Sequence, residues 1–174
     1  MSELGDRLYE EMNKQIQEEL YSAYLYYAMA AWFDSQGLTG FGQWMKVQAM
    51  EEVTHAHRFY NHIIGRGNEV NLLQIDMPKI AWSTPLEAAQ AALNHEKHIT
   101  SRINLLVKIA REEDDYTAEV SLLNWFVDEQ LEEEENTGEI VDKLKLIGDS
   151  KNGLYQIDKE LGARVLTVEA DFKW

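Results

Sequence analysis

The sequence predicts an all-α fold: a four-helix bundle with one long crossover between the second and third helices and a short fifth helix near the C-terminal end. Three observations lead to this prediction. Apolar residues recur at spacings of three and four through four long segments, as on the buried side of packed helices. The two prolines, Pro78 and Pro85, both fall in one region, with long periodic segments on either side of it. The connections between the segments are short, long and short in chain order.

Glycines mark the ends of the first two helices. The first helix is predicted over residues 6–36, before Gly37, and the second over residues 40–64, before Gly65. The third helix begins with the capping box TPLE, in which a threonine caps, a proline occupies the first turn and a glutamate reaches back. The remaining helices are predicted over residues 85–111, 115–147 and 153–163. All five helices are assigned to a single domain, residues 1–174.

The connection lengths determine how the helices are arranged. The first and second helices, like the third and fourth, are joined by a few residues, so each pair is expected to be an antiparallel hairpin. Residues 65–83 separate the second and third helices, and when extended this segment reaches roughly 60 Å at about 3.3 Å per residue. A helix of about 27 residues is only about 40 Å long. The crossover can therefore run the length of the bundle and start the third helix parallel to the second.

Each long helix carries one glutamate in the middle of an otherwise mostly apolar seam. The seam of the second helix consists of Phe41, Met45, Gln48, Glu52, His55, Phe59 and His62. The four seam glutamates are Glu19, Glu52, Glu96 and Glu133. Because antiparallel hairpins bring mid-helix positions to a similar depth, these carboxylates are expected to converge.

A single seam glutamate can bend outward to water, so one alone is weak evidence of a site. Burying four unpaired carboxylates would cost several kcal/mol each, and no lysine or arginine stands in a seam at that level. Two divalent cations would balance the four negative charges. The sequence therefore predicts a dinuclear metal site inside the bundle.

His55 extends this prediction. It follows Glu52 by three residues, about 60° round a helix, so both side chains can reach one ion. This Glu-x-x-His arrangement supplies two inward ligands in ferritin-like di-iron bundles. A site rich in oxygen with one imidazole suits iron, manganese or zinc, and the spacing does not distinguish among the three.

Charge and composition narrow the partners. The chain has 16 Lys and Arg against 31 Asp and Glu, a formal net charge of -15. Nucleic acids and anionic membranes are not expected as partners, because binding them depends on basic surface. The absence of cysteine excludes disulfides and thiolate metal sites. The start MSELGDRLYEEMNK lacks a signal-peptide pattern and no segment is long enough to span a membrane, so the expected location is the cytoplasm.

Four stretches resemble the non-haem ferritins of bacteria and archaea: EELYSAYLYYAMAAWF, GFGQWMKVQAMEEVTHAHRFYNHI, NHEKHIT and LLNWFVDEQLEEEENTGEIVDKLKLIG. With the fifth-helix stretch GLYQIDKELG, the resemblance covers nearly the whole chain. It implies an iron-storage protein with ferroxidase activity, which oxidises Fe(II) with O2 or H2O2 at a dinuclear centre. It also implies that the chain assembles with itself into a cage of 24 subunits that holds the ferric mineral.

The resemblance implies roles for particular residues. Glu19, Glu52 and His55 resemble the ligands of the first iron, with Glu52 bridging. Glu96 and Glu133 resemble the ligands of the second iron.

Further positions match the neighbourhood of that centre. Gln130 resembles a polar neighbour of the second iron, and Tyr26 resembles the tyrosine adjacent to the centre. Glu51, Glu129 and Glu132 match the carboxylates that hold a third iron in the prokaryotic non-haem branch.

The chain departs from the wider superfamily in its fourth helix. Asn136 stands three residues after Glu133, where bacterioferritins and rubrerythrin-like proteins typically carry a histidine. The absence of this histidine indicates a centre through which iron passes, and not one that retains its irons.

Haem is not expected, and Met12, Met45 and Met50 are interpreted as core or interface residues. His95 and His98, which flank the third seam glutamate, are expected to point away from the seam.

Two alternatives remain open. The first is a di-iron oxidase or peroxide reductase of the same superfamily that acts without mineral storage, as a small oligomer. The second is a shell subunit with an inactive centre. That subunit would lack the seam carboxylates, which this chain has.

Overall fold

The computed structural model describes residues 3–167 and confirms the all-α prediction. Its elements are α1 (Asp6–Ser35), α2 (Thr39–Gly65), α3 (Pro85–Glu112), α4 (Tyr116–Ala118), η1 (Glu119–Leu123), α5 (Asn124–Ile147) and α6 (Lys151–Leu161). The described part of the chain contains no β-strand. The predicted domain of residues 1–174 includes residues 1–2 and 168–174, which lie outside the described residues.

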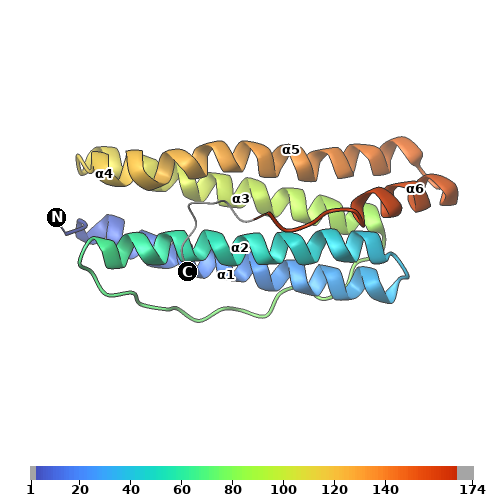
Figure 1. Cartoon of the computed structure of the whole chain (residues 1–174), viewed down its shortest axis with the longest axis horizontal. Helices are drawn as coiled ribbons and strands as arrows, with labels where there is room; N and C mark the ends of the chain where they lie inside the picture. Colours follow the sequence, from blue (N-terminus) through green and yellow to red (C-terminus); the bar gives the residue numbers. More distant parts are fainter. Residues whose placement is uncertain (1–2, 168–174) are drawn as a thin grey trace.

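The four long helices form two antiparallel hairpins, and the connection between the hairpins has no regular structure (Figure 1). α1 packs along α2, and α3 packs along α5. The crossover, residues 66–84, runs along the length of the bundle, so that α3 starts at the same end as α2 and runs parallel to it (Figure 1). The predicted topology with one long crossover is confirmed.

Local sequence signals account for the start of α3. The Thr84 hydroxyl accepts a hydrogen bond from the backbone N–H of Glu87 at 3.0 Å. Glu87 reaches back one residue further than in the usual capping box, since its carboxylate accepts from the backbone N–H of Ser83 at 2.7 Å. These bonds satisfy backbone donors that the first helical turn leaves free.

The fourth predicted helix, residues 115–147, is not uniform. It starts as the short α4, continues as the π-helical turn η1 and becomes α5. Ala118, Leu122 and Phe126 are buried at spacings of four across this region. A π-helical turn holds more residues than an α-helical turn. The wider turn therefore keeps residues spaced by four on one face, where a continuous α-helix would rotate them away from the core.

α6 closes one end of the bundle by capping α2. The Asp158 carboxylate accepts hydrogen bonds from the backbone N–H groups of Gly40 at 2.8 Å and Phe41 at 3.0 Å. A Cβ on Gly40 would stand 1.6 Å from the backbone oxygen of Asp158, so only glycine permits this approach. Two residues, Gly162 and Ala163, then lead the chain away from α6 toward the side of α2.

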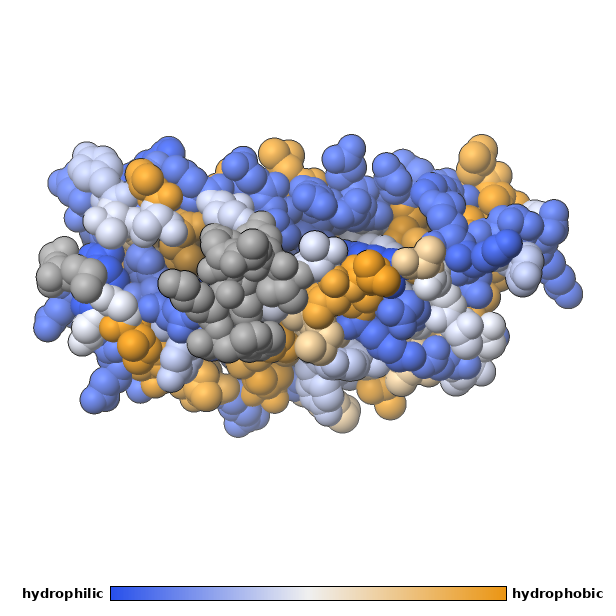
Figure 2. All heavy atoms as spheres, in the orientation of Figure 1, coloured by the Kyte–Doolittle hydropathy of each residue, from blue (hydrophilic) through white to orange (hydrophobic). Residues whose placement is uncertain are grey.

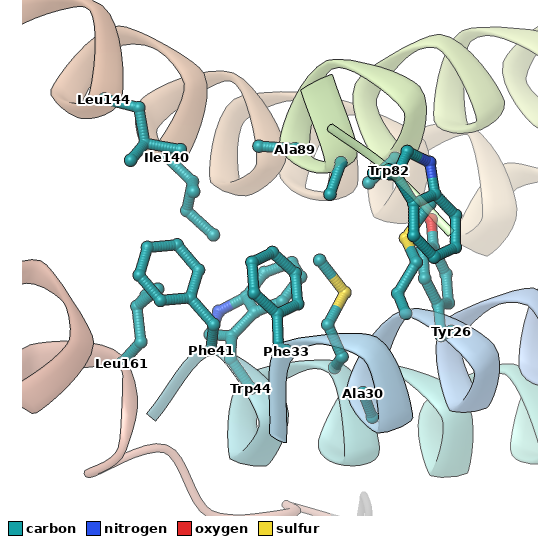
Figure 3. Packing of buried hydrophobic residues seen from close by; sticks show 14 of the residues in the cluster. Tyr26, Ala30, Phe33, Phe41, Trp44, Trp82, Ala89, Ile140, Leu144 and Leu161 are labelled. Atoms are coloured by element: carbon teal, nitrogen blue, oxygen red, sulfur yellow. The ribbon is translucent and has the colours of Figure 1, made fainter. Parts of the chain in front are cut away.

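The apolar core is divided into two clusters, one toward each end of the bundle. The cluster near α6 contains Phe33 and Phe41, whose rings stack at 4.9 Å, with Leu144 from α5 (Figure 3). The other cluster contains Phe59 and Phe126, whose rings stack at 4.3 Å. Buried polar and charged side chains from α1, α2, α3 and α5 lie between the two clusters. The fold thus places a polar layer in the interior, at mid-length of the long helices.

The surface is mainly hydrophilic in the view of Figure 2, with separate apolar side chains among charged ones. This matches the large excess of acidic residues in the sequence. Within residues 3–167, every helix is too short or too polar to cross a membrane.

Candidate metal centre

The four seam glutamates all lie in the polar layer. Glu19, Glu52, Glu96 and Glu133, one each from α1, α2, α3 and α5, are between 0% and 3% exposed. His55 of α2 is equally buried, at 3%. The structure therefore brings the five residues of the predicted dinuclear site into one interior region.

One group of ligating atoms comes from α1 and α2. Single atoms of Glu19, Glu52 and His55 all lie within 4.8 Å of one another. His55 Nδ1 is 3.2 Å from Glu52 Oε2. Gln15 Nε2 donates to Glu19 Oε1 at 3.0 Å, while Glu19 Oε2 is buried without a hydrogen-bond partner among the described residues. A buried carboxylate oxygen without a donor fits a cation ligand.

The two remaining seam carboxylates, Glu96 and Glu133, come from α3 and α5, and Glu96 belongs to neither group of potential ligand atoms that lie within 4.8 Å of one another among the described residues. The Tyr26 hydroxyl donates to Glu96 Oε1. Gln130 Nε2 lies 3.4 Å from Glu96 Oε2. Glu133 Oε2 accepts from Gln48 Nε2 at 2.7 Å. These bonds orient each carboxylate and leave its other lone pairs for a metal ion.

The three carboxylates of the predicted third position lie beside this centre. Glu51, Glu129 and Glu132 line a pocket of about 310 Å³ to which His55 also contributes. His55 Nε2 is 3.6 Å from Glu129 Oε1. Atoms of His55, Glu129 and Glu133 form a further group within 4.8 Å, so the pocket borders the buried centre at His55 and Glu129.

Burial disfavours the charged form of all four seam carboxylates when no metal is bound. Desolvation raises the pKa of Glu96 to about 8, and the negative charge of Glu133 adds to this effect. Desolvation also raises the pKa of Glu52 well above its usual value, with the charge of Glu96 second. The pKa values of Glu19 and Glu133 are raised for the same first reason. A metal ion that binds here competes with protons for these carboxylates.

Burial and hydrogen bonding shift the pKa of the His55 imidazole in opposite directions. Burial lowers its pKa, but hydrogen bonds to Glu129 and Glu52 outweigh that effect and raise the pKa well above the usual value. The carboxylates around His55 therefore favour its charged form, and a metal ion that binds the imidazole competes with a proton for it.

Three residues that sequence reasoning did not assign support the carboxylates: Gln15, Gln48 and Arg164. Gln48 stands in the α2 seam, so its role had a visible signal in the spacing. Arg164 had none, because it follows α6. Its Nη2 donates to Glu51 Oε2 at 2.6 Å. The sequence predicted no lysine or arginine in the seams at this level, and Arg164 brings a positive charge to the edge of the cluster from outside the seams.

The expectation for His95 was wrong, whereas that for His98 holds. His95 Nε2 lies 2.7 Å from Ser22 Oγ, and its ring is 6.1 Å from that of Tyr26, so it packs between α1 and α3. The small Ser22 side chain leaves room for the imidazole in this interface. His98 is exposed, and its Nε2 lies 3.1 Å from a carboxylate oxygen of Glu18.

Comparisons with known proteins agree with this architecture. Residues 9–147 match the family of ferritin-like domains. The chain is 40% identical over 166 residues to the bacterial non-heme ferritin of Staphylococcus aureus (strain NCTC 8325 / PS 47), covering 95% of this chain and 99% of that protein. It is 38% identical to the bacterial non-heme ferritin of Bacteroides fragilis (strain 638R), covering 92% of this chain and 99% of that protein. Among solved structures, an open pore ferritin from Archaeoglobus fulgidus superimposes with a TM-score of 0.92 at 43% identity, covering 95% of this chain and 100% of that one. The chain therefore belongs to the ferritin family.

Proposed function

We propose that this protein oxidises Fe(II) at a dinuclear centre in the bundle interior and stores the Fe(III) as a mineral within a cage of its own subunits. Iron storage with ferroxidase activity is the function of this ferritin. The observation that carries the assignment of the centre is the burial, at one depth, of one carboxylate from each long helix. Without cations such a cluster is strongly self-repelling.

In the proposed centre, Glu19, Glu52 and His55 bind the first Fe(II), and Glu52 bridges to the second. Glu96 and Glu133 complete the second position, with Gln130 as a polar neighbour. Each Fe(II) gives up one electron. The two electrons, with two protons, convert O2 to H2O2 or H2O2 to two waters. Hard oxygen ligands favour the ferric product, and holding both ions close together lets one oxidant take both electrons.

Tyr26 has a positioning role in this proposal. Its hydroxyl donates to the Glu96 oxygen that also belongs to the second position. Burial raises the pKa of Tyr26 well above its usual value, and the charge of Glu96 adds to this effect, so the phenol keeps its proton and remains a donor. The hydrogen bond thereby fixes the orientation of the Glu96 carboxylate.

Glu51, Glu129 and Glu132 are proposed to hold a third iron. They line one pocket with His55, on the side of that imidazole away from Glu52. The lack of a histidine at Asn136 leaves this side without a second imidazole. These three carboxylates would therefore form a route by which iron leaves the dinuclear centre.

The assembly proposed here is a homo-oligomeric cage of 24 subunits in the cytoplasm, each subunit a single domain over residues 1–174. The open pore and the engineered closed form described for the Archaeoglobus fulgidus ferritin are consistent with a hollow assembly in that relative. A small oligomer that carries no mineral would instead favour the oxidase or peroxide reductase alternative. Particle mass measured together with iron bound per particle separates the two.

Substitution of the ligands tests the centre. Glu52→Ala and His55→Ala should each slow Fe(II) oxidation by at least about 10- to 100-fold, since even residues that only support metal ligands have effects of that size. The shell should still assemble, as judged by particle mass. His98→Ala, which removes an exposed histidine, and Glu139→Ala, which removes an exposed glutamate, are the matched controls. Unchanged oxidation kinetics in both ligand variants would show that the site assignment is wrong.

A further inference from the structure

The guanidinium of Arg164 lies in the pocket that contains Glu51, Glu129 and Glu132. Its Nη2 donates to Glu51 Oε2 at 2.6 Å, and its carbon Cζ is 4.5 Å from the centre of the Trp44 ring. The arginine belongs to the segment that leaves α6 and returns along the side of α2.

The backbone of this segment is also attached to α2. Gln43 Nε2 donates to the backbone oxygen of Arg164 at 3.3 Å. This bond holds the chain in place independently of the guanidinium. The side chain can thus change position while the segment stays on α2.

The ion pair of Arg164 uses only part of its hydrogen-bonding capacity. Arginine binds carboxylates best through two parallel N–H groups. Here Nη2 donates to Glu51, whereas Nη1 is buried without a hydrogen-bond partner among the described residues. A buried donor left without an acceptor destabilises the arrangement. The guanidinium is therefore held in the pocket mainly by charge and by stacking on Trp44.

The positive charge of Arg164 occupies the part of the pocket where a metal cation would bind. Glu51 and Glu129 both line the pocket, and its inner wall is His55, a residue of the buried centre. A divalent cation bound to Glu51 and Glu129 would compete with the guanidinium, because two positive groups held at one carboxylate repel each other and each weakens the attraction of the other.

We propose that Arg164 is a built-in counter-cation of the third iron position, and that a metal ion entering this position displaces its guanidinium from Glu51. The proposal rests on the proposed function, because it assumes that Glu51, Glu129 and Glu132 bind iron. Competition with Arg164 weakens this position relative to the dinuclear centre, so iron that reaches it is released readily.

Zinc titration of the metal-free protein tests the competition without any redox step. Arg164→Gln keeps a polar side chain and removes the charge. In this variant the third Zn2+ per subunit should bind about 10-fold tighter, equivalent to about 1.4 kcal/mol, by isothermal titration calorimetry. The first two Zn2+ should bind as in the natural protein. Arg7→Gln, which removes an exposed arginine paired with Glu112, is the matched control and should not change any affinity.

Fluorescence of Trp44 reports whether the guanidinium actually moves. The third equivalent of Zn2+ should change the Trp44 emission of the natural protein, because the stacked cation leaves, and should not change it in Arg164→Gln. Subtracting the signal of Trp44→Phe isolates this tryptophan. Arg164→Lys retains the charge but loses the planar fork, so its third affinity should lie between those of the other two proteins. If Arg164→Gln fails to assemble, the Lys variant and the Trp44 signal of the natural protein still decide the outcome.

Several results would overturn the proposal. If Arg164→Gln binds the third Zn2+ no tighter than the natural protein does, Arg164 does not compete with metal. If two Zn2+ bind and no third is detected in any variant, the third position and this proposal both fail, while the dinuclear centre stands. If no Zn2+ binds in the interior at all, the proposed function itself fails.

Discussion

Glu96→Gln should stabilise the metal-free protein, and the size of the gain should depend on pH. Glu96 is fully buried, and its pKa is raised to about 8 from an ordinary value of 4.5, first by desolvation and then by the charge of Glu133. Because the pKa is raised in the folded state, Glu96 does not reduce the free energy of unfolding below about pH 4.5. The free energy of unfolding then falls as the pH rises from about 4.5 to about 8.

The magnitude follows from the difference between the two states. In the unfolded chain Glu96 ionises with its ordinary pKa of 4.5, which lies about 2.5 units below pH 7, so releasing the proton lowers the free energy of the unfolded state. The folded protein still holds this proton at pH 7. At about 1.4 kcal/mol per unit, the buried carboxyl lowers the free energy of unfolding by about 3 kcal/mol at pH 7. At pH 5 the same reasoning gives less than about 1 kcal/mol.

Glutamine has nearly the shape of glutamate and does not ionise. Its side-chain oxygen can still accept the hydrogen bond from the Tyr26 hydroxyl, and its NH2 group replaces the oxygen that lies 3.4 Å from Gln130 Nε2, so the change removes the titration and this long contact with Gln130. Glu96→Gln should therefore raise the free energy of unfolding by about 3 kcal/mol at pH 7 and by less than about 1 kcal/mol at pH 5. It should also abolish binding at the second metal position.

Denaturant unfolding of chelator-treated protein at both pH values measures this effect. Subunit concentration must be held constant, because oligomer stability depends on it. Glu139→Gln, an exposed change on α5, is the control and should have little effect at either pH. If Glu96→Gln lowers stability by the same amount at pH 5 and pH 7, the carboxyl is not held protonated by burial and this reasoning is refuted.

Two further predictions concern metal binding. Gln48→Leu removes the donor to Glu133 Oε2, so the second Zn2+ should bind about 10- to 100-fold more weakly by calorimetry, and an unchanged affinity would contradict the positioning role of Gln48. Zn2+ binding at pH 7 should release at least about one proton per subunit, because Glu96 with a pKa of about 8 is largely protonated before metal binds. The observed heat should then vary with the ionisation enthalpy of the buffer, and equal heats in phosphate and Tris would contradict this prediction.

The spacing rule predicted the interior of the helices better than their ends. In the α2 seam, the positions from Phe41 to Phe59 are buried, but at the end of the helix Ile63 is fully buried and His62 only partly so. A seam of alternating fours and threes has a period of 3.5 residues, whereas an α-helix has 3.6. The difference accumulates along the helix, so the predicted face turns away from the core at the end.

The π-helical turn η1 could not be predicted for a related reason. Ala118, Leu122 and Phe126, which are buried before, within and after η1, have spacings that also occur in sequences of ordinary helices. Only the position of the core decides whether the backbone widens to keep them facing inward. The same applies to His95, whose placement depends on the room that Ser22 leaves between α1 and α3.

By itself, the order of residues determined the four helices, their hairpins, the long crossover and the four convergent carboxylates. These follow from periodicity and connection length, which are local properties of a chain. Tertiary structure decided which side chains from other elements contact the carboxylates of this region. Gln48 reaches Glu133 from another helix, and Arg164 reaches Glu51 from a segment 113 residues away along the chain. The seam spacing places Gln48 on the inner face of α2, but which carboxylate it meets, and where Arg164 lies, depend on where the chain returns in space.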